Sequence, residues 1–246
     1  MQLKGSYAYP MPSCALARML LTVTAVLMPV TSVLVPMDAD QSGPGAAITP
    51  PGVFFSIWGL VILGSWAVAV LGWFRSAAPI VDAVAWPLVI AQTGFSVWLL
   101  FAHLRRTHPL VEAIGTVATL GVILTSLLIA IAHLRTARGQ FLWLVAGTVG
   151  LFAGWSSAAI WLNIVTVLPD AVGDSMIVQT LAVTGAAIAT LAVIVKLRPA
   201  WTYAAAVIWA LIGIAIAAAH FGAWPPFAVA LSGIVIVSVV TVRTRR

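Results

Sequence analysis

The chain has 246 residues, of which 62% are hydrophobic and only 7% are charged, and its mean hydropathy is +1.11. Soluble domains carry about 25% charged residues, so this composition excludes a water-soluble globule and predicts an integral membrane protein surrounded by the lipid bilayer. The net charge of +6 comes from short basic clusters between apolar runs, a pattern typical of membrane loops rather than of a nucleic-acid-binding surface.

Eight apolar runs are long enough to cross a membrane, since a helical span needs about 20 apolar residues. Charges, prolines and polar clusters separate them, and no run shows the alternation of a transmembrane β-strand. The sequence therefore predicts an all-α polytopic membrane helix bundle of about eight transmembrane helices. The expected helices cover residues 15–36, 52–74, 86–104, 109–132, 140–168, 174–196, 200–219 and 225–242.

The positions of Lys and Arg predict the orientation of these helices, because cytoplasmic loops are enriched in both residues. With the N-terminus inside, ten basic residues lie on the cytoplasmic side, and only Arg105 and Arg106 lie on the other side. The outer side also carries four acidic residues, Asp38, Asp40, Asp170 and Asp174. We therefore predict a multi-pass protein of a bacterial cytoplasmic membrane with both termini in the cytoplasm.

Tryptophan is unusually frequent, with 11 Trp against 3 Tyr. Trp and Tyr favour membrane interfaces, and that preference explains five residues near helix ends: Trp73, Trp86, Trp143, Trp201 and Trp224. Three others fall near the middle of their spans: Trp66, Trp155 and Trp209. Trp58, Trp98 and Trp161 each lie about six residues from an outer helix end, roughly 9 Å below that boundary. Three large rings at one depth predict a shared pocket.

Three polar side chains are expected within or at the ends of these spans. Gln92 and Asn163 should face other helices, because an amide in hydrocarbon needs a partner. They either hydrogen-bond between helices or face a ligand, and the sequence leaves both interpretations open. Glu112 opens the helix expected over 109–132, where a carboxylate favours the positive end of the helix dipole, with proton coupling as the alternative.

Gly150 and Gly154 form a GxxxG unit on the helix expected over 140–168. Such a unit permits close approach of a second helix backbone. The partner is either another helix of the same chain, which an eight-helix bundle favours, or a second copy of the chain. A homodimer is therefore left open.

The chain contains none of the common catalytic signatures, such as a Walker loop, G-x-G-x-x-G, H-E-x-x-H or G-x-S-x-G. Its one cysteine, Cys14, excludes a disulfide framework and a multi-cysteine metal site. We therefore predict no catalytic residue and no metal site.

Three short motifs lie in order on the second, third and fifth expected helices. Residues 50–58 read Pro-Pro-Gly-Val-Phe-Phe-Ser-Ile-Trp, and Gln92 and Trp98 follow on the third helix. Residues 155–163 begin with Trp and end with Leu-Asn. This set resembles the TspO/MBR family, the tryptophan-rich sensory proteins related to the mitochondrial translocator protein.

The resemblance implies that residues 1–168 form a TspO-like five-helix ligand-binding bundle. Residues 169–246 then add three transmembrane helices, as in longer members of the group. Two positions depart from the family pattern, since Ile62 stands where Tyr is usual and Phe95 stands where Asn is usual. These departures remove a phenol and an amide from the expected pocket.

The resemblance also implies a pocket beneath the loop between the first two helices, which binds flat hydrophobic ligands such as a porphyrin, haem or a sterol-like molecule. Arg105 and Arg106 would lie at its mouth, where they either bind the carboxylates of a tetrapyrrole or pair with nearby aspartates. The residues expected to bind the ligand are Phe54, Trp58, Gln92, Trp98, Trp155, Trp161 and Asn163.

The function expected from these features is binding of a hydrophobic planar molecule, for sensing or trafficking, without catalysis. A small secondary transporter is one alternative, for which the eight spans and the polar residues within them argue. A porphyrin-modifying enzyme that uses an excited tryptophan is another. A structural subunit of a larger membrane complex is also left open.

Overall fold

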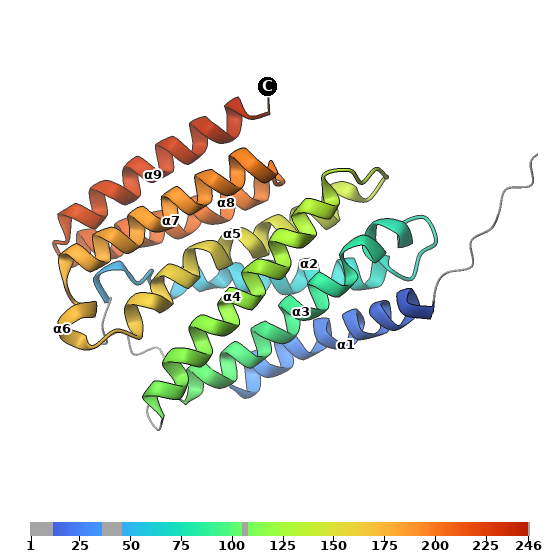
Figure 1. Ribbon diagram of the computed structural model, residues 1–246, viewed down its shortest axis with the longest axis horizontal. Coiled ribbons are helices and arrows are strands. Elements are labelled where there is room, and N and C mark those ends of the chain that lie inside the picture. The colour runs from blue at the N-terminus through green and yellow to red at the C-terminus, as the bar shows by residue number, and fades with distance from the viewer. Residues whose placement is uncertain (1–11, 36–45, 105–107, 246) are drawn as a thin grey trace, which may run out of the picture.

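The computed structural model describes residues 12–35, 46–104 and 108–245, and this part of the chain contains helices and no strand. Eight of the helices are long and apolar enough to cross a membrane. The predicted all-α polytopic bundle is therefore confirmed (Figure 1). The elements are α1 (Pro12–Leu34), the 3₁₀ helices η1 (Ala46–Ile48) and η2 (Gly52–Ser56), α2 (Ile57–Leu71), α3 (Ala78–His103), α4 (Pro109–Leu134), α5 (Leu142–Thr166), α6 (Asp170–Gly173), α7 (Met176–Leu197), α8 (Trp201–His220) and α9 (Trp224–Arg243).

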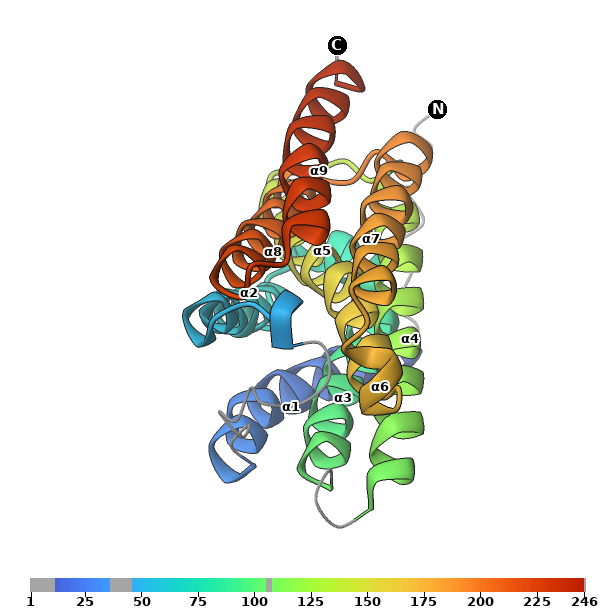
Figure 2. The same cartoon turned by 90° about the vertical axis from the view of Figure 1, so that its left-hand side faces the viewer.

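Helix α5 is the centre of the bundle. It packs against α2, α3, α4, α7 and α8, and Figure 2 shows these helices around it. Helix α1 packs on α2 and α3, whereas α9 packs on α7 and α8 at the opposite edge. One continuous hydrophobic core includes residues from all eight long helices. The division into residues 1–168 and 169–246 stays a prediction, and the two parts are packed together through α5.

The glycine face of α5 lies against α8 of the same chain. A Cβ atom placed on Gly154 would collide with the backbone oxygen of Tyr203, and one placed on Gly150 would lie 2.5 Å from the hydroxyl of Thr202. That hydroxyl donates a hydrogen bond of 2.7 Å to the carbonyl oxygen of Gly147. The close approach that the GxxxG unit permits is therefore made within one chain, and the homodimer remains a prediction.

Helix α3 begins earlier than the sequence predicts. It starts at Ala78 instead of residue 86. The charge of Asp82 predicts a break before the membrane span, but the helix continues through this residue. Arg18 of α1 donates hydrogen bonds of 2.6 and 2.5 Å to the two carboxylate oxygens of Asp82. This bidentate ion pair, only partly exposed, compensates the carboxylate and lets the helix extend past it.

Replacing Asp82 with asparagine is expected to lower the free energy of unfolding by about 1.5–3 kcal/mol, since a charge-assisted bidentate pair is lost. Unfolding by SDS in mixed micelles measures this change. The control is Asp170→Asn, which makes the same substitution at an exposed residue of α6. A double variant with Arg18→Gln should lose less than the sum of the two single changes, and strict additivity would contradict the coupling.

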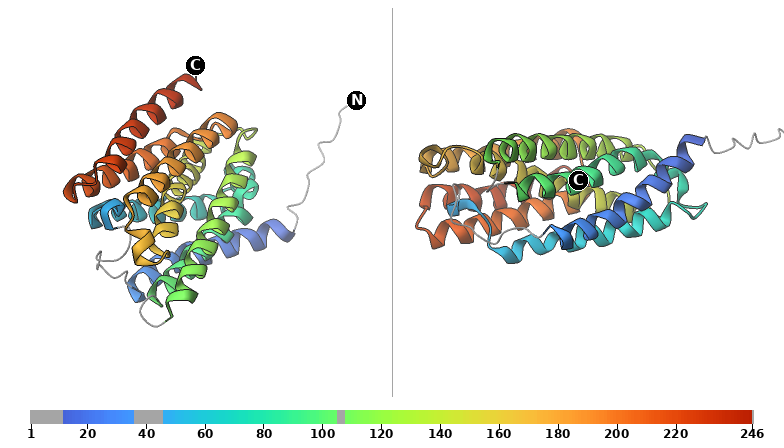
Figure 3. Two further views of the ribbon diagram at one scale, coloured as in Figure 1. Left: turned by 60° about the vertical axis from the view of Figure 1, so that its left-hand side comes forward. Right: turned by 90° about the horizontal axis from the view of Figure 1, so that it is seen from below.

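The charges divide the bundle into two unlike ends. The long helices run side by side from one end to the other (Figure 3), and we name the ends by their charge. The basic end, where α1 begins and α9 ends, carries every described Lys and Arg, namely Arg18, Arg75, Arg135, Arg138, Lys196, Arg198, Arg243 and Arg245. The acidic end, where α6 lies, carries Glu112, Asp170 and Asp174. Glu112 is in the first turn of α4, as the sequence predicted.

Candidate functional site

Six aromatic rings from four elements, η2, α2, α3 and α5, meet inside the acidic half of the bundle. They come as three pairs with the spacing Phe-x-x-Trp, one each on η2–α2, α3 and α5. Residues three apart lie on one helix face, so each pair presents two rings to the same neighbour. We name this set the aromatic cluster; its members are Phe55, Trp58, Phe95, Trp98, Phe152 and Trp155.

Trp58 is the centre of the aromatic cluster. Its ring centroid lies 4.5 Å from that of Phe95, 5.7 Å from Phe152, and 6.3 Å from both Trp98 and Trp155. These separations fall in the range of favourable aromatic pairs, and most of the rings are tilted or edge-on. Trp155 is 2% exposed, and Trp58 and Trp98 are each 7% exposed. The cluster is therefore a closed set of tightly packed rings that joins α2, α3 and α5.

Two indole groups of the cluster differ in their hydrogen bonding. The Nε1 of Trp98 donates to the Oδ1 of Asn163 at 3.2 Å, and the Nδ2 of Asn163 donates to the carbonyl oxygen of Ala159 at 3.0 Å. The Nε1 of Trp58 is buried and has no partner among the described residues. An unsatisfied buried donor costs about 1–3 kcal/mol, so this N–H is suited to an acceptor that a ligand would supply.

Gln92 lies one turn before Phe95 on α3 and is fully buried. Its Oε1 accepts a hydrogen bond of 2.6 Å from the hydroxyl of Thr24 on α1, so the amide links two helices. Its Nε2 has no partner among the residues that the structure describes. The Oε1 atom of Gln92 therefore supports the interhelical hydrogen bond, whereas its Nε2 atom supports the ligand-facing interpretation.

Phe54 and Trp161 lie outside the aromatic cluster, although both were expected in the pocket. The ring of Trp161 lies over Gly185 of α7. The ring of Phe54 lies 4.6 Å from that of Trp209 on α8, whose Nε1 donates to the Phe54 carbonyl oxygen at 2.9 Å. The structure thus brings Trp58, Trp98, Trp155 and Asn163 together and places the other two against the C-terminal helices.

Two other predicted site residues, Arg105 and Arg106, lie outside the described residues, as do Asp38 and Asp40. Within the part of the chain that is described, no group of three or more His, Cys, Asp or Glu side chains could hold a metal ion. The side chains of the aromatic cluster and of Asn163 provide ring faces, indole N–H groups and an amide. Groups of this kind, mostly apolar with a few hydrogen-bonding atoms, are typical of the lining of sites for apolar small molecules.

Sequence reasoning missed three phenylalanines and one tryptophan of this region. Phe55, Phe95 and Phe152 complete the cluster, and the signal that could have found them is the threefold Phe-x-x-Trp spacing. Phe95 was treated only as a missing amide, yet its ring is the nearest to that of Trp58. Trp209 was recognised only as a mid-span residue, because its partner is 155 positions away.

Comparison with families of known proteins gives a match. The profile of a family described as TSPO-like protein matches residues 15–243, a range that covers all eight long helices except the first three residues of α1. No curated protein and no solved structure was found to match the chain.

Proposed function

The chain belongs to the TSPO-like protein family, and from that premise we propose that it binds a hydrophobic planar ligand, tetrapyrrole-like or sterol-like, at the aromatic cluster. The binding serves sensing or trafficking of that ligand. The observation that carries the proposal is the buried Nε1 of Trp58, which has no partner among the described residues although four other rings surround its own.

Binding of a ligand requires the rings of the cluster to move apart. A planar ligand inserts between rings that now touch each other, so Trp58 and its neighbours must separate as the ligand enters. Each ring that stacks on the ligand stabilises the complex by about 0.5–1.5 kcal/mol beyond the apolar area buried, and this offsets the cost of separating the rings. Asn163, which accepts the hydrogen bond from Trp98, is only partly buried, and this favours the acidic end as the side of access.

Binding is favoured over catalysis because the cluster and Asn163 offer indole and amide groups, neither of which acts as a general acid or base near neutral pH. Loss of bound porphyrin under illumination would instead favour the porphyrin-modifying enzyme. Accumulation of ligand inside protein-containing vesicles would favour transport.

The same charge pattern supports a proposal for orientation. The eight described Lys and Arg residues lie at one end, with Asp82 as the acidic residue of that end. Because Lys and Arg are enriched on the cytoplasmic side, the basic end faces the cytoplasm of a bacterial cell and the aromatic cluster lies nearer the outer surface.

Removing the Trp58 donor tests the proposed site. In Trp58→Phe a ring remains, but the N–H that would bind the ligand is lost. We expect the dissociation constant for protoporphyrin IX to rise about two- to tenfold, which is the worth of one hydrogen bond. Quenching of intrinsic tryptophan fluorescence in detergent micelles gives the constant for each variant.

The control is Trp143→Phe, because Trp143 is 72% exposed and lies near the start of α5, at the basic end. It removes the same indole far from the cluster, so its dissociation constant should equal that of the unmodified protein. Equal constants for all three proteins would contradict the assignment of the site to Trp58. Fluorescence that protoporphyrin IX leaves unchanged would contradict tetrapyrrole binding itself.

A further inference from the structure

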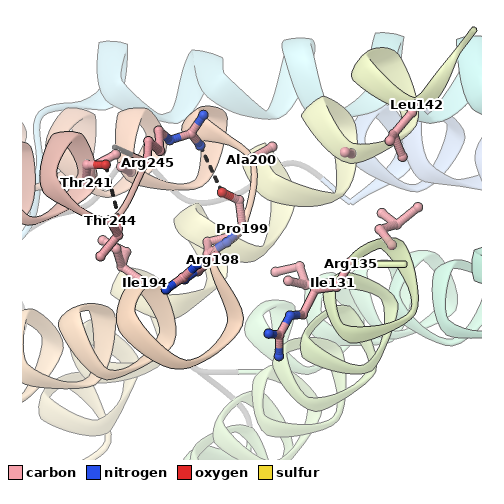
Figure 4. A pocket seen from close by; sticks show the side chains of 13 residues that line it. Ile131, Arg135, Leu142, Ile194, Arg198, Pro199, Ala200, Thr241, Thr244 and Arg245 are labelled. Carbon is pink, nitrogen blue, oxygen red and sulfur yellow. Dashed lines mark hydrogen bonds between the residues drawn. The ribbon is translucent and has the colours of Figure 1, made fainter. Parts of the chain in front are cut away.

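A cavity lies at the basic end, far along the bundle from the aromatic cluster. Its volume is about 340 Å³, and it lies where α4, α7 and α9 end and where α5 and α8 begin (Figure 4). Nothing in the proposed ligand site uses it. We name it the arginine pocket, after three residues that line it: Arg135, Arg198 and Arg245.

The arginine pocket carries positive charge, and none of the described residues that line it is acidic. The carboxylate of Asp82, which lies at the same end, is already held by Arg18. Figure 4 shows Arg135 and Arg198 reaching the cavity from α4 and from the α7–α8 connection. Guanidinium groups have the planar fork that binds phosphate oxygens in pairs, so three of them around one cavity favour a phosphate group.

Two of the arginines have distinctive backbone features. The Nη2 of Arg245 donates to the carbonyl oxygen of Pro199 at 2.9 Å, which ties the end of α9 to the α7–α8 connection. Arg198 caps α7 with φ 47° and ψ 56°, a left-handed conformation that favours glycine. An arginine at such a position carries a conformational cost, and its side chain is directed to the rim of the cavity.

The remaining wall of the pocket is apolar. Ile131, Leu134 and Ile194 line it and are buried. Thr241 also lines it, and its Oγ1 is buried without a partner among the described residues. A cationic rim above an apolar wall matches an amphiphile that has an anionic head and a hydrocarbon chain.

We propose that the arginine pocket binds the phosphate head group of an anionic membrane phospholipid, with an acyl chain along Ile131, Leu134 and Ile194. The three guanidinium groups hold the phosphate oxygens, and the hydroxyl of Thr241 supplies a further hydrogen bond. Such a lipid joins the ends of α4, α7 and α9, and therefore stabilises the C-terminal helices against α4 and α5.

The test uses the full-length chain in detergent micelles with dioctanoyl phosphatidic acid, dioctanoyl phosphatidylcholine and inorganic phosphate as separate probes. Native mass spectrometry measures binding, and thermal unfolding measures stabilisation. We expect phosphatidic acid to bind at least about tenfold more tightly than phosphatidylcholine and to raise the melting temperature. Phosphate that bound as tightly as phosphatidic acid would overturn the lipid and indicate a soluble phosphate ligand.

Arg198→Gly is the decisive variant, because glycine accepts the left-handed conformation and the fold is kept while the guanidinium is lost. Arg135→Gln is the second. Each should weaken phosphatidic acid binding about tenfold or more and leave the melting temperature without lipid unchanged or, for Arg198→Gly, raised.

The matched controls are Arg138→Gln and Arg243→Gln, which remove one charge at the same end from residues that do not line the pocket. Equal weakening by the controls would overturn the site, because it would indicate attraction to the whole basic end. Unchanged affinity in Arg198→Gly and Arg135→Gln would also overturn it. Trp58→Phe should leave phosphatidic acid binding unchanged, so this proposal and the planar-ligand proposal fail separately.

Discussion

Replacing Gly154 with leucine is expected to separate α8 from α5 and to lower the free energy of unfolding by about 3 kcal/mol or more. Even a Cβ atom at this position would collide with the backbone oxygen of Tyr203 and lie 2.9 Å from the Cβ of Ala206. Backbone atoms cannot rotate away as a side chain can, so the whole helix must shift. Unfolding by SDS in mixed micelles measures the loss.

The matched control is Gly121→Leu on α4, where a Cβ atom would meet nothing within 4 Å. Leucine is a better helix former than glycine by somewhat less than about 1 kcal/mol, so the control should be neutral or slightly stabilising. The separation of α8 should also break the 3.0 Å hydrogen bond between Ser157 and Tyr203. A Gly154→Leu protein as stable as the control would show that α8 does not depend on this close approach.

The eight long helices could be predicted because length and hydropathy alone determine a span. The boundaries of these helices are harder to predict where a charged residue has a partner on another helix. Asp82 looked like the end of a span in isolation, yet Arg18 lies 64 residues earlier and neutralises it. Only the folded bundle brings the two together, so the first eight residues of α3 were missed.

The sequence predicts how deep the tryptophans of the candidate site lie in the bundle, but not toward which helix each side chain points. Trp58 and Trp98 do meet, because residues at the same height on neighbouring helices are close. Trp161 lies at a height similar to that of Trp58 and Trp98, but it points in another direction. A helix turns about 100° per residue, so Trp161, six residues after Trp155 on α5, lies about 240° from it around the helix axis. Trp155 therefore faces Trp58, whereas Trp161 faces Gly185 on α7. Depth alone does not supply this rotation.

The C-terminal helix α8 helps to position the aromatic cluster. Trp209 of α8 packs against Phe54 in a tilted arrangement and donates to its carbonyl oxygen, and Phe54 immediately precedes Phe55 of the cluster. Gly213 of α8 leaves room for the same segment, since a Cβ there would lie 2.8 Å from the Phe54 ring. Helix α8 thus holds η2 in place, and η2 in turn positions the start of α2 and Trp58.

Replacing Trp155 with alanine is expected to lower the free energy of unfolding by about 3–5 kcal/mol, the cost of deleting a large buried aromatic side chain. Trp155 is among the largest fully packed side chains of the chain, at 2% exposed. Its ring centroid lies 5.5 Å from that of Phe55 and 6.3 Å from that of Trp58, so its loss leaves a hole between α2 and α5. SDS unfolding followed by circular dichroism measures the change.

Two comparisons separate packing from other effects of this substitution. Trp143→Ala deletes the same side chain at an exposed position of α5 and should change the free energy of unfolding by less than about 1 kcal/mol. Trp155→Phe keeps one ring against Phe55 and Trp58 and should recover part of the loss. If Trp155→Ala were as mild as Trp143→Ala, the rings would not be packed tightly enough to hold α2 on α5. The closed aromatic cluster would then be excluded, because only a large side chain without close packing partners could be removed at so small a cost.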